Sequence, residues 1–242
     1  MTNRSQKKVL AAPEGMRIYA IGDIHGCSKE LDQLTTSIVR DSADAPDSRA
    51  IVYLGDYIDR GPDSKGVLDR LLNPPSGFAA YHVRGNHDQV MLDFLADPAV
   101  YREWGEFGGR ETLASYGVAP PRGDDGAYAR ARDRLLLALP PRHLDFLNRL
   151  PLSVTLGDYL FVHAGIRPGI ALGNQSLEDL MWIRNDFLDS TEDFGTVVVH
   201  GHTPGENPVR RANRIGVDTG CYASGRLTAA VLEGTTCRFL RS

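Results

Sequence analysis

The chain has 242 residues, of which 42% are hydrophobic and 24% charged, so it can bury the core of an ordinary globular domain. Its net charge of −4 argues against the basic surface of a nucleic-acid-binding protein, and no apolar run approaches membrane-spanning length. The odd number of widely spaced cysteines (Cys27, Cys221 and Cys237) forms no disulfide framework, so we expect a reducing cytoplasmic compartment.

The first 13 residues are polar and basic and lack the apolar segment of a signal peptide, so we predict a flexible tail over 1–13. No linker divides the remaining chain, which predicts a single domain over 14–242.

Three β-loop-α units open this domain. The strands are predicted over 16–21, 51–54 and 79–83, and the helices that follow them over 28–38, 65–72 and 89–96. Successive units of this kind favour parallel strands with right-handed crossovers. Their loops should therefore open at one edge of a sheet.

The segment from about 97 to 150 breaks this pattern. Helix-forming stretches interrupted by glycine and proline indicate a helical insertion, which could shape substrate access or simply provide packing. Strands then return over 153–156, 159–162, 196–199, 214–217, 227–232 and 236–240, with a helix over 177–188. Taken alone, the strand pattern predicts one mixed sheet in an α/β domain.

Five strand ends deliver polar side chains to the same place. These are Asp23 and His25; Asp56, Asp59 and Arg60; Asn86 and His87; His163; and His200 and His202. Each taken singly could be a turn or a hydrogen-bonded core histidine. Together they would repel or desolvate one another unless a cation compensates, which favours a metal site. Oxygen and nitrogen ligands suit Mn, Fe, Zn or Mg, and no cysteine pair suggests thiolate-bound zinc.

Six candidate ligands are too many for one catalytic ion, so we predict two ions that share a carboxylate. The six are Asp23, His25, Asp56, Asn86, His163 and His202. Arg60 adds a planar donor that suits phosphate oxygens. The residues therefore predict a binuclear phosphoester hydrolase.

Three blocks carry a resemblance to a known family: Gly22-Asp23-Ile24-His25-Gly26, Gly55-Asp56-Tyr57-Ile58-Asp59-Arg60-Gly61 and Gly85-Asn86-His87-Asp88. They resemble the signature blocks of the phosphoprotein phosphatases of the calcineurin-like metallophosphoesterase superfamily. His163-Ala164-Gly165 and Gly201-His202-Thr203 are similar to its later ligand blocks. The resemblance covers about residues 16 to 220, and Asp88 and the short chain point to the bacterial and phage-type serine/threonine phosphatases.

The resemblance implies an α/β fold with a β-sandwich of two mixed sheets flanked by helices. It assigns Asp23, His25 and Asp56 to the first ion, and Asp56, Asn86, His163 and His202 to the second. A hydroxide bridging two divalent ions, manganese before iron, zinc or magnesium, would attack phosphorus in line.

The same resemblance makes His87 the general acid, oriented by Asp59. Arg60, Arg184 and Asn86 would hold the phosphate, and His200 stays outside the ligand set. The implied partner is a phosphorylated protein or a small phosphoester, with no nucleic acid, membrane or regulatory subunit.

Serine/threonine protein phosphatase is thus the first hypothesis for function. A symmetrical dinucleoside tetraphosphate hydrolase is the alternative, because Val162–Ile166 and Gly61–Ser64 are similar to that enzyme too. In the family pattern those hydrolases lack an acid at the position of Asp59. The resemblance therefore implies that Asp59 favours the phosphomonoesterase. A non-catalytic phosphate-binding module is the third hypothesis, and the intact set of ligands and acid argues against it.

Overall fold

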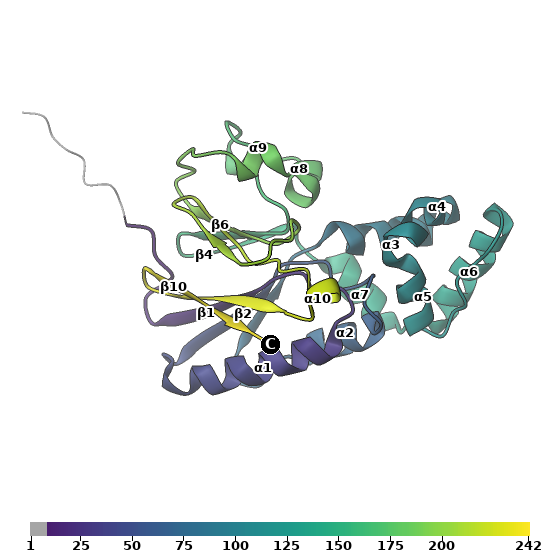
Figure 1. Ribbon diagram of the computed structural model, residues 1–242, viewed down its shortest axis with the longest axis horizontal. Helices are drawn as coiled ribbons and strands as arrows, with labels where there is room; N and C mark the ends of the chain where they lie inside the picture. Colours follow the sequence, from purple (N-terminus) through teal and green to yellow (C-terminus); the bar gives the residue numbers. More distant parts are fainter. Residues whose placement is uncertain (1–8) are drawn as a thin grey trace, which may run out of the picture.

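Two five-stranded sheets form the centre of the structure, a computed structural model in which residues 9–242 are described (Figure 1). The first sheet contains β1 (Met16–Ile21), β2 (Ser48–Tyr53), β3 (Ala79–His82), β9 (Thr228–Glu233) and β10 (Thr236–Arg241), in the order β10-β9-β1-β2-β3. The second contains β4 (Ser153–Leu156), β5 (Tyr159–Val162), β6 (Val197–His200), β7 (Val209–Arg210) and β8 (Arg214–Gly216), in the order β4-β5-β6-β8-β7. Most of the predicted tail over 1–13 lies outside the described residues.

Helices flank both sheets. They are α1 (Ser28–Asp41), α2 (Ser64–Leu71), α3 (Asn86–Ala96), α4 (Tyr101–Trp104), α5 (Arg110–Ser115), α6 (Asp125–Ala138), α7 (Pro141–Arg149), α8 (Leu177–Trp182), α9 (Asn185–Leu188) and α10 (Cys221–Ser224). Short turns of other helix types are η1 (Ser42–Asp44), η2 (Pro98–Val100), η3 (Gly105–Gly109) and η4 (Leu172–Asn174). Two mixed sheets flanked by helices confirm the fold that the resemblance implied.

The three opening units are arranged as predicted. β1 pairs with β2 and β2 with β3, both in parallel, so that Ile21, Tyr53 and His82 end neighbouring strands at one edge. The single mixed sheet expected from the strand pattern is wrong, however. The later strands β4 to β8 pair among themselves, because hydrophobic patterning reports which faces are buried and not which strands are neighbours.

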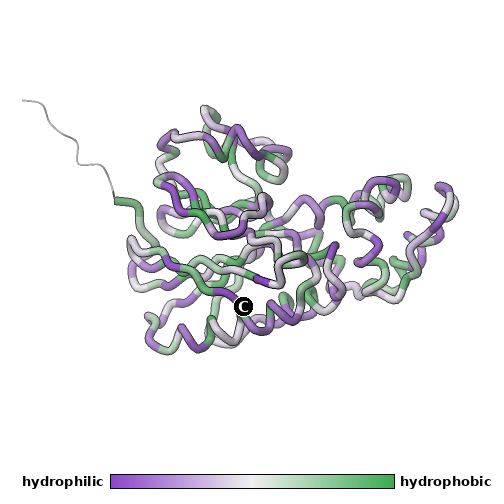
Figure 2. Tube along the Cα trace, in the orientation of Figure 1, coloured by the Kyte–Doolittle hydropathy of each residue, from purple (hydrophilic) through white to green (hydrophobic). Residues whose placement is uncertain are grey.

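The space between the sheets is filled by apolar side chains from both. Ile18 and Val52 of the first sheet belong to the same buried cluster as Phe161 and Val199 of the second. Figure 2 shows hydrophobic stretches, in green, among hydrophilic ones in both sheets. Full burial of one such side chain contributes roughly 1.5–3 kcal/mol, and Phe161→Ala should cost about 3–5 kcal/mol. This core holds the two sheet edges in fixed relative positions.

The insertion over 97–150 contains α4 to α7 and extends away from the sheets, to the right in Figure 1. Its η3 turn has a kink at Gly108, whose φ of 112° only glycine adopts easily. A Cβ at Gly108 would collide with the backbone of Arg60, so the insertion touches the second strand-end loop directly.

The predicted helix over 177–188 is broken into two. Ile183 and Arg184 leave helical geometry (Arg184 has φ −128° and ψ −104°), and α9 starts again at Asn185. Because of this break, Arg184 lies between two helices and not within one. The hydrophobic periodicity of the sequence does not predict the break. None of the helices described over residues 9–242 is both long and apolar enough to cross a bilayer.

Candidate metal centre

The loops that follow the strands of both sheets bring the predicted residues together. Their side chains are almost completely buried, between 0 and 5% exposed: Asp23, His25, Asp56, Asp59, Asn86, His87, His163 and His202. The first sheet supplies the loops up to residue 88, and the second supplies those at 163 and 202. The five loops therefore meet at the neighbouring edges of two sheets rather than at the edge of one.

Backbone strain is concentrated in these loops. Over residues 9–242, all the non-glycine residues with positive φ lie here: His25, Asp56, Asp59, Arg60 and His202, at 46–72°. Each such conformation costs of order 1–3 kcal/mol and persists only where the surroundings impose it. Asp88 supplies part of that constraint, because its carboxylate accepts the backbone N–H groups of Gly85, Asp56 and Tyr57 at 2.9–3.1 Å. Such a cluster of strain is typical of a functional site.

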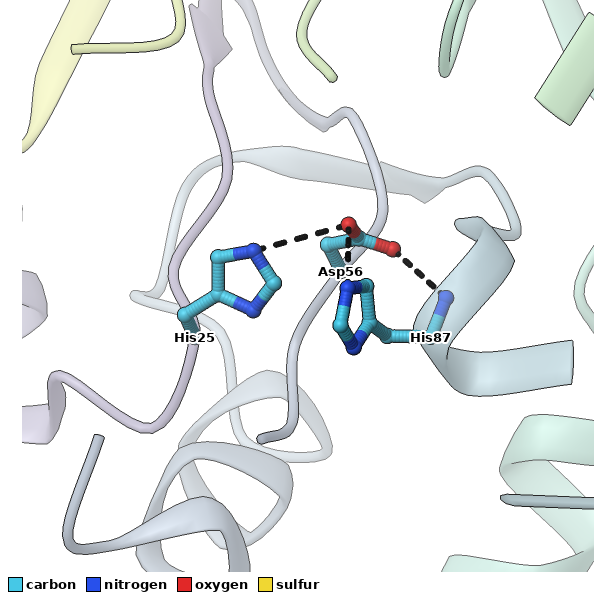
Figure 3. A group of neighbouring side chains, drawn as sticks. All are labelled: His25, Asp56 and His87. Carbon is cyan, nitrogen blue, oxygen red and sulfur yellow. Dashed lines mark hydrogen bonds and ion pairs between the residues drawn. The ribbon is translucent and has the colours of Figure 1, made fainter. Parts of the chain in front are cut away.

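Asp56 is the centre of the arrangement (Figure 3). Two groups of three donors share it, His25–Asp56–His87 and Asp56–His163–His202, and in each group the donor atoms lie within 4.8 Å of one another. Asp56 Oδ2 is 3.5 Å from Nε2 of both His25 and His163. The geometry places Asp56 between two potential ion positions, where the sequence predicted a shared carboxylate.

The tautomers of His25 and His163 favour a bound cation. Nδ1 of His25 donates to the Ile58 carbonyl at 2.8 Å, and Nδ1 of His163 donates to the Leu54 carbonyl at 2.8 Å. Burial lowers the pKa of both imidazoles, to about 3 for His25, so both are neutral and Nε2 carries a lone pair. Two lone pairs thus face a carboxylate oxygen, which is unfavourable unless a metal ion lies between them. The donor set fits divalent metal ions.

Asn86, His163 and His202 form the second half of the site. Asn86 Oδ1 is 2.8 Å from His163 Nε2 and 3.0 Å from His202 Nδ1. Those two ring nitrogens are 3.2 Å apart. The three atoms converge as ligands of one ion would.

Asp23 contacts the backbone of His202. Both of its oxygens accept the His202 backbone N–H at 3.1 Å, and a Cβ at Gly201 would overlap one of them. Asp23 is not a member of either close donor group, whereas His87, predicted as an acid, is. Burial, with the nearby carboxylates of Asp218 and Asp56, raises the pKa of Asp23 well above its usual value. A cation at this position would relieve that cost.

His87 is held by a buried carboxylate. Its Nδ1 is 2.7 Å from Asp59 Oδ2, and the indole N–H of Trp104 donates to the same oxygen at 2.8 Å. The Thr112 hydroxyl donates to the other oxygen, Oδ1, at 2.5 Å. Burial opposes protonation of His87, but the carboxylates of Asp56 and Asp59 outweigh it and raise the pKa of the imidazole. This ring is prepared to carry a proton near neutral pH.

Two arginines line the cavity above these side chains, which has a volume of about 140 Å³. Arg60 Nη2 lies 3.2 Å from His87 Nε2, and its guanidinium carbon lies 4.6 Å from the ring centre of Tyr222. Arg184 reaches the same cavity from the break between α8 and α9. His200 is separate, since its ring nitrogens face the Gly201 carbonyl and the Arg214 guanidinium.

Sequence reasoning missed four residues of this site. Asp218 follows β8, is 6% exposed and has a pKa raised to about 6 by burial, and the rule that found the other strand-end acids could have found it. Trp104, Thr112 and Tyr222 gave no usable signal. They reach the site from α4, α5 and α10, and only the packing of these helices shows it.

A family model described as calcineurin-like phosphoesterase matches residues 16–230. The asymmetrical bis(5'-nucleosyl)-tetraphosphatase PrpE of Geobacillus sp. (strain WCH70) is 30% identical over 233 residues, which cover 88% of this chain and 89% of that protein. The symmetrical bis(5'-nucleosyl)-tetraphosphatase of Ralstonia nicotianae is 27% identical, with 88% of each chain covered. A crystal structure of a provisionally assigned diadenosine tetraphosphatase superposes with a TM-score of 0.65 over 96% of each chain at 23% identity, which supports the fold.

Proposed function

The chain belongs to the calcineurin-like phosphoesterase family, and on that premise we propose that it is a metal-dependent hydrolase of dinucleoside tetraphosphates. The observation that carries the proposal is the pair of donor groups that share the buried carboxylate of Asp56. The substrate class is supported by the names of curated relatives, which are bis(5'-nucleosyl)-tetraphosphatases of both the asymmetrical and the symmetrical kind. They favour the alternative hypothesis over the protein phosphatase.

The proposed metal ligands combine the set that the family resemblance implies with the two donor groups around Asp56, with His87 kept as the acid. Asp23, His25 and Asp56 would hold one ion, and Asp56, Asn86, His163 and His202 the other. When bound, two divalent ions supply Lewis acidity and an activated water at neutral pH, and manganese is the first to test. The chain itself fixes the ligands through Ile58 and Leu54, whose carbonyls set the tautomers of His25 and His163.

The remaining residues would bind and protonate the substrate. Arg60 and Arg184 line the cavity and would hold phosphate oxygens as charge develops on them. His87 would hold a proton at Nε2 for the leaving group while Nδ1 stays on Asp59. With phosphate bound, the Arg60 guanidinium would turn from His87 Nε2 to the phosphate.

Serine/threonine protein phosphatase is the second candidate, because a specific contact favours it. An alkoxide leaving group needs a strong general acid, and the His87–Asp59 pair at 2.7 Å would provide one. A phosphate leaving group is far less basic and depends on such an acid less.

A side-by-side assay tests both functions. With manganese present, release of two ADP molecules from diadenosine tetraphosphate would identify symmetrical cleavage, and release of AMP and ATP asymmetrical cleavage. We expect kcat/KM for this substrate to exceed that for a phosphoserine peptide. The reverse order would replace the proposal with the second candidate.

A further inference from the structure

Two exposed aromatic rings border the candidate metal centre. Phe107 is 60% exposed and Trp182 46% exposed, although both line the cavity that holds His87 and Arg60. Neither ring belongs to, or packs against, a buried core cluster of the described residues. Large aromatic side chains exposed at the opening of a cavity commonly mark a ligand surface.

Phe107 has a rigid support. It lies in η3, where the backbone of Gly108 abuts Arg60 and the backbone of Gly109 abuts the Trp104 ring so closely that neither position could hold a Cβ. Trp104 in turn is anchored by its hydrogen bond to Asp59. The Phe107 ring therefore projects from a segment fixed to the site, and its position is not that of a loose loop.

Trp182 comes from the other side of the structure. It ends α8, which lies with α9 beside the second sheet, at the top of Figure 1, whereas η3 belongs to the insertion on the right. The indole packs edge-on against His202 at 6.2 Å between ring centres. The two rings thus reach one opening from two independent elements.

The space continues beyond the metal centre. A second cavity of about 420 Å³ shares Val90, Trp104, Phe107 and Trp182 with the first. Asp93, Arg102 and Glu103 give it a polar border. A molecule with an anionic group on the arginines could extend past both rings into this cavity. Its size and mixed lining suit a small organic group rather than an ion.

We infer that Phe107 and Trp182 bind one nucleobase of the substrate, with the polyphosphate on Arg60 and Arg184. The inference rests on the proposed function, because it supplies the site for one nucleoside. Flat heterocycles stack on aromatic rings, and a polar border can bond their edges. The inference also assigns a function to the insertion. One of its segments would place Phe107 against the base and Trp104 against the Asp59 carboxylate, which holds His87.

The test compares a nucleotide with the same anion lacking a base. ADP and inorganic pyrophosphate serve as inhibitors of p-nitrophenyl phosphate hydrolysis by the manganese-loaded protein. The variants Phe107→Leu and Trp182→Leu remove the flat ring but keep an apolar side chain, and Phe107→Tyr and Trp182→Phe restore a ring. Leu137→Ala, at a residue 90% exposed on α6, is the control.

The leucine variants should raise the inhibition constant of ADP about five- to a hundredfold, and that of pyrophosphate much less. The ring-restoring variants should recover most of the ADP affinity, and the control should match the native protein. Equal changes for ADP and pyrophosphate, or none, would overturn the inference even if diadenosine tetraphosphate is hydrolysed. A selective loss of ADP affinity without hydrolysis of diadenosine tetraphosphate would instead reject the proposed substrate and keep the nucleobase site.

Discussion

His87 and Asp59 form a buried pair, with Nδ1 of the ring 2.7 Å from Oδ2 of the carboxylate. Asp59 is 0% exposed and also accepts hydrogen bonds from Trp104 and Thr112. Its three partners leave the carboxylate no freedom to turn. The ring of His87 is therefore held with Nε2 directed at the cavity, where a leaving group would need a proton.

Replacing His87 should separate substrates by their leaving groups. His87→Asn should reduce kcat by about 10²–10⁴-fold on a phosphoserine peptide, whose alkoxide must be protonated. The loss should be smaller on aryl phosphates and on dinucleoside tetraphosphates, whose leaving groups are weaker bases. Steady-state kinetics on the three substrates measures this. An equal loss on all of them would argue against an acid at this position.

The Asp59→Asn variant checks the same contact from the other side. It should lower kcat by about 10- to 100-fold, because the asparagine amide can turn its NH2 group toward Nδ1, and NH2 accepts no hydrogen bond from the ring. Metal content should not change, since Asp59 is in neither group of close donors. Loss of metal together with activity would show that Asp59 supports the ligands instead.

Asp56→Asn should remove bound metal and activity together. The carboxylate is the one donor shared by both groups, and an amide replaces a charged oxygen with a neutral one. Elemental analysis of the purified protein, with the rate measured on the same sample, is the direct measurement. Asp145→Asn, at an exposed pair with Arg149, is the matched control and should retain both ions. An active Asp56→Asn variant with two ions would refute the shared position.

Arg184→Ala should weaken inhibition by inorganic phosphate, about tenfold if the guanidinium contacts the anion. The residue was predicted from a sequence block, and the structure brings it to the cavity through the break between α8 and α9. Inhibition constants for phosphate decide the matter, with Arg149→Ala, an exposed arginine on α7, as control. Unchanged inhibition would assign Arg184 to the solvated surface.

His82 should make the fold sensitive to acid. Its ring stacks on Tyr53 at 4.8 Å, its Nε2 is buried without a partner among residues 9–242, and burial lowers its pKa to about 4. The unfolded chain, with a pKa near 6.5, binds the proton first, so stability is lost as pH falls from about 6.5 towards 4. Between pH 7.5 and 5 the loss from this residue should be about 2 kcal/mol.

The variant His82→Phe keeps a ring against Tyr53 and removes the titration. Urea unfolding at pH 7.5 and 5 should show the native protein losing about 2 kcal/mol more than the variant. Other buried histidines, such as His200, titrate in both proteins and cancel in the comparison. Parallel losses would mean that His82 is protonated in the folded state.

The sequence alone determined the local chemistry of this protein. Some strand ends can be recognised directly in the sequence, because an apolar run followed by glycine and charged groups cannot continue into a core. These are the strands that end in Asp-x-His, Asp-x-x-Asp-Arg and Asn-His. These strand ends predict three parallel β-loop-α units, a carboxylate shared by two ions, and a phosphoesterase. These features depend on residues close together in the chain.

Only the tertiary structure decided what depends on contacts between distant segments. The strand pattern could not show that β4 to β8 form a second sheet, since patterning marks buried faces and leaves the pairing open. It also gave no sign that Trp104 and Thr112 hold Asp59, or that Phe107 and Trp182 line one opening. Such contacts join residues 45 or more positions apart, and packing between whole elements brings them within reach.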